Sequence, residues 1–365
     1  MLLQRYLVYS SFLVSMLGLF LFPARAADTP PQGRLMYNEV GPVASRCRIR
    51  LFTWPGKQAR SVAPIAAGGA TLRGYVGPAT ASPKGNNVAF VCSSSPDVRG
   101  TDLWIMDMET GNSRRVTGDE GGYYDARWSP DSAYLIATTP QGQFADEDAL
   151  TQVPRSALVS VELKTGKRFC LAKPAEYPAW SKSGTHVYYR EPGNDWMLRV
   201  SRSGGKASRV LRFTGKVATP PNRRDDRAVT EEATTRRLIF GKAAARVLSD
   251  VLGPVPGILE SWSNGHGQLA VVETARPNVR DTAYHGTLAI YSLDTGERRY
   301  LSCAGADLSI IAWPKSSDWM LVTDIAQGKT AGRERRVFGV RTTDGKRIPK
   351  VDVPETATGR TWNDG

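Results

Sequence analysis

Histidine and cysteine, which often bind metals or act in acid–base and nucleophilic chemistry, number only three and four in this 365-residue chain. The three histidines, His186, His266 and His285, lie in separate stretches and share no metal-ligand spacing. The acidic run at residues 146–148 lacks the alternating order of a calcium loop. The chain has no G-x-S-x-G nucleophile motif and no complete phosphate-binding loop. We therefore expect no catalytic residue, no metal site and no cofactor, and we favour a binding module over an enzyme.

Two short sequence phrases recur along the chain and indicate a repeated structural unit. The first reads Trp-Ser-Pro-Asp-Ser at residues 128–132, and an apolar run follows it. Proline presets φ and aspartate binds its own backbone, so the phrase predicts a tight turn between two strands. The phrase starts at position 81 and then at Trp128, Trp180, Trp262, Trp313 and Trp362, with steps of 47, 52, 82, 51 and 49 residues.

The second phrase is a strand, a Thr-Gly or Gly turn, a basic pair and another strand. It is clearest at residues 103–117 and has copies at 158–171, 198–211, 288–301 and 337–351, with a worn copy at 49–65. Together the two phrases predict a unit of four antiparallel strands, A to D. Four strands every 40–50 residues or so are typical of the blades of a β-propeller.

The best-preserved copies resemble the repeat of TolB-like β-propellers. The matching segments are residues 128–131, 103–107, Thr110-Gly111 and 114–117. The resemblance extends over nearly all of the chain after the leader and implies an all-β propeller. In that family the propeller usually serves as a docking surface for envelope proteins, and related propellers precede peptidase domains. The repeats here begin near Arg34, so we expect no counterpart of the α/β domain that precedes the propeller in TolB.

The two ends of the repeat region complement each other. Residues 34–40 are predicted to be a B strand, and residues 362–365 match an A strand and its turn. We expect these segments to pair and to close the ring, which gives seven blades in a single domain at 34–365. The alternative is six blades, if the worn unit at 215–250 is not a blade. That unit is predicted to hold strands near 227–230 and 237–240, with a short helix as the alternative for 243–252.

The first 26 residues have the pattern of a secretory signal peptide. Arg5 precedes an apolar run at 6–22, and Ala24-Arg25-Ala26 forms a small-residue cleavage site. An uncleaved anchor is the alternative. Cleavage after Ala26 would leave a short linker at 27–33, no transmembrane stretch and a net charge of +11, because Arg5 and Arg25 are removed from a total of +13. We expect a periplasmic or secreted protein with no nucleic-acid partner.

The strand order predicts that the D–A and B–C loops share one face, at the mouth of the central channel. We expect this mouth to bind an envelope protein or peptide, since tyrosines offer flat area with a polar group. The alternatives are that these aromatic residues fill the space between blades, or that a hydrolase or lyase site for a glycan or peptide lies in the channel. The candidate residues are Tyr75, Tyr123, Tyr124, Asp125, Glu176, Tyr177 and Glu260.

Basic residues follow the C–D turns and are predicted to form an outer rim. Such a rim could contact an anionic glycan or lipid surface. Alternatively, the charges provide solubility and protect the outer strand edges from pairing. The rim residues are Arg114, Arg115, Lys167, Arg168, Arg298 and Arg299.

Four cysteines follow the leader, and they allow three pairings that spacing alone does not distinguish. Cys47 begins a predicted C strand and Cys92 ends a B strand of the next unit, so a disulfide between them is geometrically feasible. Cys170 and Cys303 fall in distant units and are not expected to pair.

Overall fold

The computed structural model divides the chain into two units, Met1–Pro30 and Pro31–Gly365, and every described residue lies in the second unit. The structure describes residues 33–39, 48–54, 59–62, 79–83, 85–93, 100–119, 121–140, 156–214, 228–232, 237–256, 258, 261–275, 285–313, 318–327, 333–347, 351–352 and 357–363.

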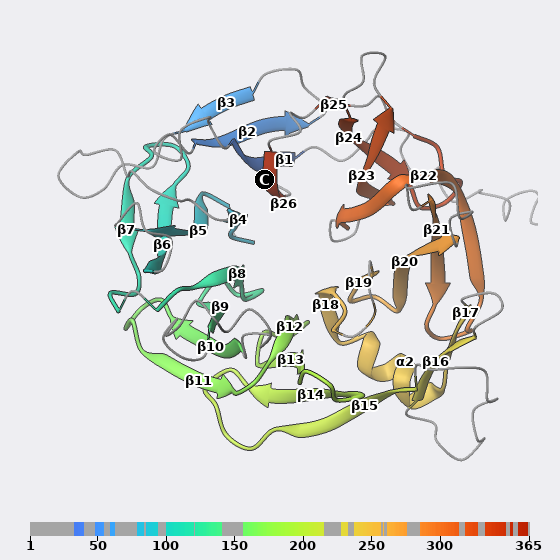
Figure 1. Cartoon of the computed structure of the whole chain (residues 1–365), viewed down its shortest axis with the longest axis horizontal. Coiled ribbons are helices and arrows are strands. Elements are labelled where there is room, and N and C mark those ends of the chain that lie inside the picture. Colours follow the sequence, from blue (N-terminus) through green and yellow to red (C-terminus); the bar gives the residue numbers. More distant parts are fainter. Residues whose placement is uncertain are drawn as a thin grey trace, which may run out of the picture. The chain divides into compact units, whose positions relative to one another are not determined.

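Three of the sheets have four antiparallel strands each (Figure 1). The first contains β26 (Ala357–Asn363), β1 (Gly33–Glu39), β2 (Arg48–Trp54) and β3 (Ala59–Val62). The second contains β4 (Thr80–Ala81), β5 (Asn87–Ser93), β6 (Thr101–Asp107) and β7 (Ser113–Arg115). The third contains β8 (Tyr124–Trp128), β9 (Tyr134–Pro140), β10 (Ser156–Glu162) and β11 (Arg168–Ala172).

The remaining strands join into one sheet of fourteen, which contains further antiparallel groups of four. One group is β12 (Glu176–Ser181), β13 (His186–Arg190), β14 (Trp196–Ser201) and β15 (Ser208–Thr214). Another is β19 (Ser261–Asn264), β20 (Gln268–Ala275), β21 (His285–Ser292) and β22 (Arg298–Ala312). The long β22 also pairs with β23 (Trp319–Gln327), which continues to β24 (Arg333–Arg341) and β25 (Val351–Asp352).

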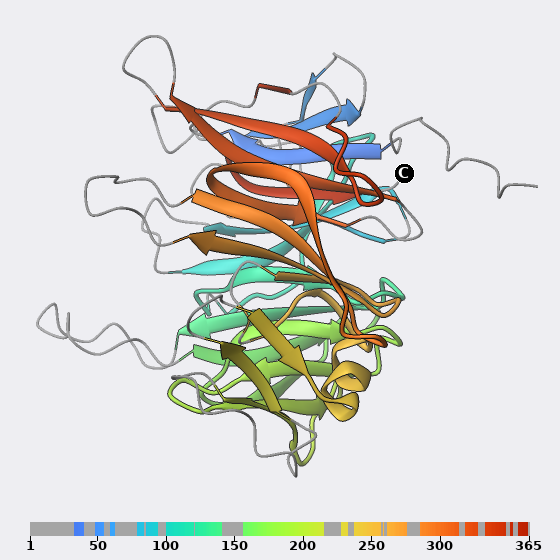
Figure 2. The same cartoon turned by 90° about the vertical axis from the view of Figure 1, so that its right-hand side faces the viewer.

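The unit between β15 and β19 is irregular. It contains β16 (Ala228–Glu232), β17 (Arg237–Phe240), the helix α2 (Lys242–Leu248) and β18 (Val251–Pro254). β16 pairs in parallel with β15, and β18 lies between β12 and β19. The helix contacts β15 and β17 (Figure 2). Both strands expected here are present, and a helix overlaps the segment where the alternative placed one. These strands extend neighbouring groups instead of forming a four-stranded sheet of their own within the described residues.

The expected pairing of the terminal segments is present. β1 pairs antiparallel with β26, with Leu35 opposite Trp362 and Arg34 opposite Asn363. The A strand of this group is therefore supplied by the last described residues, and strands B to D by the first. β26 also contacts β4 of the next sheet.

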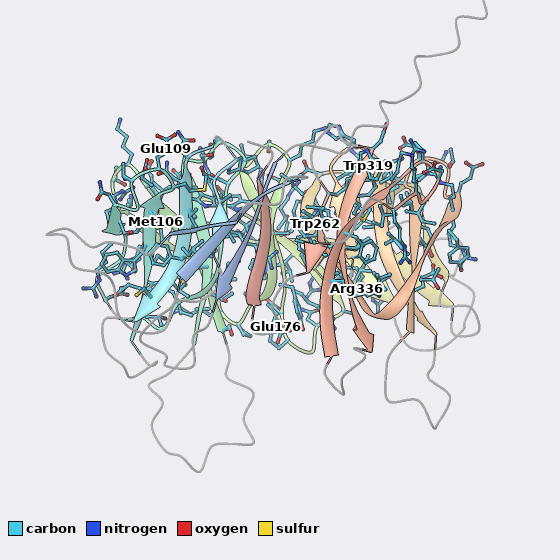
Figure 3. All side chains as sticks on the ribbon, turned by 90° about the horizontal axis from the view of Figure 1, so that it is seen from above. Met106, Glu109, Glu176, Trp262, Trp319 and Arg336 are labelled. Carbon is cyan, nitrogen blue, oxygen red and sulfur yellow. The ribbon has the colours of Figure 1, made fainter. Side chains whose placement is uncertain are left out.

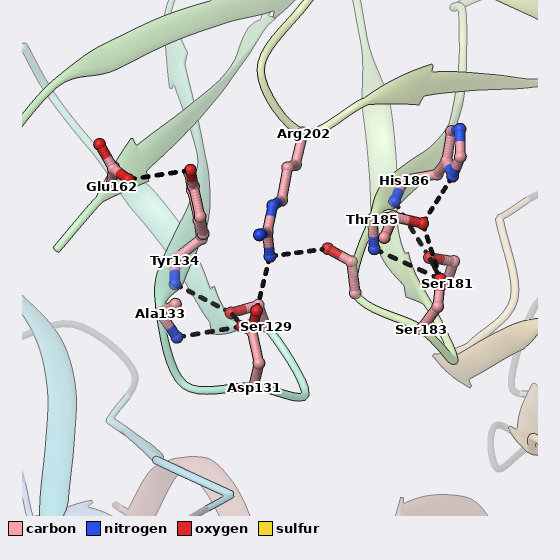
Figure 4. Close-up of polar contacts among 11 residues, drawn as sticks. Ser129, Asp131, Ala133, Tyr134, Glu162, Ser181, Ser183, Thr185, His186 and Arg202 are labelled. Carbon is pink, nitrogen blue, oxygen red and sulfur yellow. Dashed lines mark hydrogen bonds and ion pairs between the residues drawn. The ribbon is translucent and has the colours of Figure 1, made fainter. Parts of the chain in front are cut away.

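The recurring Ser-Pro-Asp phrase forms a closed turn between strands A and B. The Ser129 hydroxyl donates to Asp131 Oδ1 at 2.5 Å and accepts the Tyr134 backbone N–H at 2.9 Å (Figure 4). Asp131 Oδ1 also accepts the Ala133 N–H at 3.1 Å, and Ser132 takes a left-handed φ of 58°. These bonds satisfy the polar groups of the turn at residues 129–134 locally.

The recurring tryptophan connects consecutive sheets. The Trp128 indole Nε1 donates to the Thr80 carbonyl at 2.8 Å, and the Trp180 Nε1 donates to the Arg127 carbonyl at 3.2 Å. In both cases an A-strand tryptophan donates to the A strand of the preceding sheet. The core lies between the sheets, and Ile136 and Trp180, from consecutive sheets, share one buried cluster. Trp128 and Trp180 are thus structural contacts between consecutive sheets.

An ion pair clamps the same two sheets at the turn face. Arg202 Nη1 lies 2.6 Å from Asp131 Oδ2, and its guanidinium lies 4.2 Å from the centre of the Tyr134 ring (Figure 4). Burial alone would raise the pKa of Asp131. The hydrogen bonds from Ser129 and Arg202 outweigh that effect and lower the pKa below its ordinary value.

Candidate docking site

Several A strands, but not β4 or β19, have a bulge just before the position of the recurring tryptophan. Each bulged strand has one residue more than its partner strand across the shift. Such an insertion bends the strand and changes the direction of a side chain. The register shifts fall at residues 124–127 of β8, 176–179 of β12, 306–309 of β22 and 358–361 of β26.

The bulge of β12 presents Tyr177 to solvent. Tyr177 has a φ of 52° and its side chain is 54% exposed. A non-glycine residue in the left-handed region carries backbone strain, and strain of this kind is common at binding sites. The adjacent Glu176 is half-buried and lies at the face opposite Glu109 (Figure 3). Tyr177 is therefore a large aromatic side chain held in place at this face by a bulged strand.

The rim beside Tyr177 is low. β13 has five residues, while the equivalent strands β1, β5, β9, β20 and β23 have seven to nine. Ten residues separate the start of β13 from the start of β14, against fourteen to twenty-two in the other groups. We call residues 173–178 and 190–195 the low rim. Its short B–C connection leaves Tyr177 accessible.

The low rim carries three carboxylates. Glu176 lies opposite Arg190 across the β12–β13 ladder, and Glu191 follows directly. The Arg190 side chain is directed to its own loop, with Nε donating to the Asn194 carbonyl at 2.9 Å. The third carboxylate, Asp195, is exposed. Burial, together with the Glu191 charge, raises the pKa of Tyr189 to about 12. The low rim is thus a locally acidic surface on a basic protein.

The other predicted mouth residues are distributed differently. Tyr75 and Glu260 lie outside the described residues, and of Tyr124 and Asp125 only the backbone, in β8, is described. Tyr123 is described and is only 3% exposed. This position favours the interpretation that some of these aromatic residues fill the space between sheets.

Tyr123 belongs to a polar clamp between two sheets. Its hydroxyl donates to both Asp119 carboxylate oxygens at 3.1 Å and accepts from Arg168 Nη1 at 2.9 Å. Burial is the main reason that the pKa of Tyr123 is raised above its ordinary value. Of the described mouth residues, Glu176 and Tyr177 thus lie in β12 at the low rim, whereas Tyr123 is buried.

Four of the six predicted rim cations are engaged within the protein. Their partners are Asp102 for Arg115, Asp119 for Arg168, Glu273 for Arg298, and the Thr342 and Thr343 carbonyls for Arg299. Lys167 lies 5.0 Å from the centre of the Phe169 ring, and Arg114 is exposed. Three of the six positive charges are therefore compensated by a carboxylate.

The sequence did not indicate a cluster around Glu273, whose side chain is 8% exposed. Glu273 Oε2 accepts from the Tyr300 hydroxyl at 2.8 Å, and Glu273 Oε1 accepts from the Tyr291 hydroxyl. Arg298 lies 3.4 Å from the carboxylate and 4.5 Å from the centre of the Tyr300 ring. Tyr300 itself is 49% exposed. The four residues come from three adjacent strands, so only the strand register could have predicted this cluster.

Among the described residues, no group of three His, Cys, Asp or Glu side chains could hold a metal ion. His186 Nδ1 lies 2.9 Å from Thr185 Oγ1, and His266 Nδ1 lies 3.4 Å from Lys182 Nζ. His285 begins β21, and its side chain is not described. The described histidine side chains thus have ordinary polar neighbours in the turn region.

Cys92 is buried in a cluster that includes Ile49, and Cys47 lies outside the described residues. Cys170 is exposed on β11, and Cys303 lies within β22, where only the backbone is described.

In the described part of the chain, no helix is long and apolar enough to span a bilayer.

The sheets define the class of the fold as a β-propeller, and comparisons with solved structures give particular likenesses. The crystal structure of TolB from Acinetobacter baumannii matches 90% of this chain with a TM-score of 0.54 and 15% sequence identity. This chain spans 66% of that protein. A structure from a study of two prolyl endopeptidases matches 91% of this chain with a TM-score of 0.54 and 13% identity, and this chain spans 50% of it.

No family model matches the chain, and no curated protein matches it in sequence. The likeness to TolB therefore concerns the fold, and it confirms the TolB-like propeller resemblance indicated by the repeats.

Proposed function

We propose that this chain is an exported, non-catalytic docking module that binds a protein or peptide of the cell envelope. The binding surface is the face that carries the D–A and B–C loops. The observation that supports this most strongly is Tyr177, a large exposed side chain on a strained backbone beside the low rim. Solvent-exposed aromatic residues with a polar group are typical anchors of protein interfaces.

The scaffold of this proposal is a six-bladed ring closed by β26 and β1. The four-stranded groups that begin with β4, β8, β12, β19, the second half of β22 and β26 support that number over seven. In this interpretation the unit from β16 to β18 fills the space between two blades. The β26–β1 pair joins the two ends of the repeat region within one group, which is the contact that would close the ring.

Export rests on the leader at residues 1–26. We propose cleavage after Ala26, a linker at 27–33, a propeller domain at 34–365 and a periplasmic or secreted location. Intact-mass measurement of the protein purified from a bacterial envelope fraction should give a chain that begins at Ala27. A chain that retains residues 1–26 would support a membrane anchor instead.

We also propose a disulfide between Cys47 and Cys92. Ile49 of β2 packs in the same buried cluster as Cys92. The sequence predicts that this strand begins at Cys47, and on such a strand Cys47 would face the same way as Ile49. Peptide mapping without reductant should find the two cysteines in one linked fragment. Alkylation of both thiols in the oxidised, unfolded protein would contradict the pairing.

Affinity capture from envelope extract tests the docking role. The full chain and its Tyr177→Ala and Tyr300→Ala variants are compared, each at low and at high salt. Tyr300→Ala is the control, because both tyrosines are exposed but only Tyr177 lies at the low rim. The proposal expects one defined protein to bind the wild type and Tyr300→Ala at both salt concentrations, and to be lost with Tyr177→Ala.

A different result would move the function to the basic rim. That result is retention by anionic lipid or glycan alone, which disappears at high salt and does not change in Tyr177→Ala. The engaged state of Arg115, Arg168, Arg298 and Arg299 is the reason we favour docking over this alternative.

A further inference from the structure

The described part of the chain has six aromatic rings with a basic side chain placed over them. Lys or Arg side chains lie 4.2–5.8 Å from the centres of these rings. Within the described residues, Tyr177 has no such cation. The rings that have one are Phe169, Tyr134, Trp196, Tyr300, Trp319 and Phe338.

The Tyr300 cluster shows the complete arrangement. Arg298 covers the Tyr300 ring at 4.5 Å and reaches the Glu273 carboxylate at 3.4 Å, while the Tyr300 hydroxyl donates to that carboxylate. The guanidinium therefore has an aromatic face and a carboxylate at the same time. Both contacts favour a planar cation, and Arg suits them better than Lys.

The low rim also has an exposed aromatic ring and carboxylates, but among the described residues no cation lies over the ring. Tyr177 offers an exposed ring, and the carboxylate of Glu176 is its chain neighbour, with Glu191 following the strand partner of Glu176. The nearby Arg190 donates from Nε to its own loop. Lys173 and Arg190 are outnumbered by Glu176, Glu191 and Asp195, on a chain whose net charge is +13. The local charge therefore complements a cationic partner.

We propose that the low rim binds an extended peptide segment of the partner through an arginine side chain. The guanidinium would lie over the Tyr177 ring with Glu176 as its carboxylate partner. This inference rests on the proposed docking function and names the chemistry that the partner must supply. The short B–C connection of this group provides the access that an extended segment needs.

The test selects displayed random peptides on the immobilised full chain and then measures the enriched peptides in solution. Wild type, Tyr177→Phe, Tyr177→Leu and Glu176→Gln are compared, and thermal unfolding verifies that each variant is folded. Enriched peptides should share an arginine. Replacement of that arginine by glutamine should weaken binding to the wild type by about 3- to 30-fold.

The double-mutant cycle separates the cation–ring contact from other effects. Tyr177→Phe should bind like the wild type, whereas Tyr177→Leu should bind as weakly as the wild type binds the glutamine peptide. In Tyr177→Leu, replacement of the peptide arginine by glutamine should therefore cause little further loss of affinity. Glu176→Gln should bind the arginine peptide more weakly than the wild type does, and should bind the glutamine peptide with unchanged affinity.

Two groups of results would overturn the inference, and they differ in what they mean for docking. Enriched peptides that depend on Tyr177 but contain no arginine, or an arginine effect that is unchanged in Tyr177→Leu, would refute the cation contact and leave docking intact. Enrichment that does not depend on Tyr177, or no enrichment on the wild type, would count against the proposed function as well.

Discussion

Tyr300 and Tyr177 are the two large hydrophobic side chains that the described residues expose to solvent, and their surroundings differ. Tyr300 has its own cation and carboxylate, and both its ring and its hydroxyl are in use. Tyr177 has no such cation among the described residues, and its backbone is strained. Exposed area alone therefore does not identify a site. An aromatic residue whose contacts are satisfied internally stabilises the fold, and one held out by a strained bulge is available to a partner.

The largest expected effect comes from breaking the satisfied cluster. Glu273→Ala leaves Arg298 and two tyrosine hydroxyls without their carboxylate in a nearly buried position. We expect the free energy of unfolding to fall by about 3 kcal/mol. Urea denaturation measures the change.

Glu176→Ala is the matched control, because Glu176 stands beside the exposed tyrosine of the low rim. Its effect on unfolding should stay below about 0.5 kcal/mol. Equal losses in both variants would remove the distinction between the two tyrosines.

An intermediate effect of opposite sign is expected at Tyr177. Tyr177→Gly should raise the free energy of unfolding by about 0.5–1 kcal/mol, because glycine adopts a positive φ without a Cβ clash. The same variant should lose capture of the partner. Chemical denaturation and affinity capture on one protein preparation test both statements.

Tyr300→Gly should destabilise the protein, because it removes ring contacts and a hydrogen bond from an ordinary strand position. If Tyr177→Gly were destabilising too, Tyr177 would be part of the core framework and not a side chain held for binding.

The smallest expected effect is on the pH dependence of stability, and it comes from the ion pair between Asp131 and Arg202. This pair joins the sheet of β8 to β11 to the group of strands that contains the low rim. Because the pKa of Asp131 is lowered in the folded protein, its contribution to stability is present above the usual aspartate range. That contribution is lost as pH falls through the lowered value. Asp131→Asn should therefore flatten the acid side of a plot of melting temperature against pH.

The location of this change distinguishes the two regions. Hydrogen exchange in Asp131→Asn should increase in β9 and β14, which lie next to the clamp, and stay unchanged in β20 to β22, which contain the Tyr300 cluster. The shift in melting temperature should be small, because the Asp131 side chain is 38% exposed and solvent screens its ion pair. A uniform change in exchange would mean that the clamp does not act locally.

Much of the fold was predictable from local patterns. The Ser-Pro-Asp phrase forms the hydrogen-bonded turn that its residue types predict, and the tryptophan spacing marks successive A strands. The pairing of the terminal segments was also predicted correctly from the incomplete units at the two ends.

Local sequence patterns predicted the irregular unit and the site less well. The parallel pairing of β16 with β15 and the position of β18 between β12 and β19 depend on contacts distant in sequence. Glu176 and Tyr177 were predicted as mouth residues, but the positive φ of Tyr177 follows from a bulge with no sequence signature of its own. The burial of Tyr123 and the cluster around Glu273 both depend on register and on packing between sheets.

The most direct test of docking at the low rim is site-specific photocrosslinking in living cells. A photoreactive phenylalanine analogue replaces Tyr177 in one strain and Tyr300 in another, since both positions are exposed. We predict a crosslinked adduct of one defined mass from position 177 and none from position 300. Adducts of equal yield from both positions, or from position 300 alone, would contradict the assignment of the docking surface to Tyr177 and the low rim.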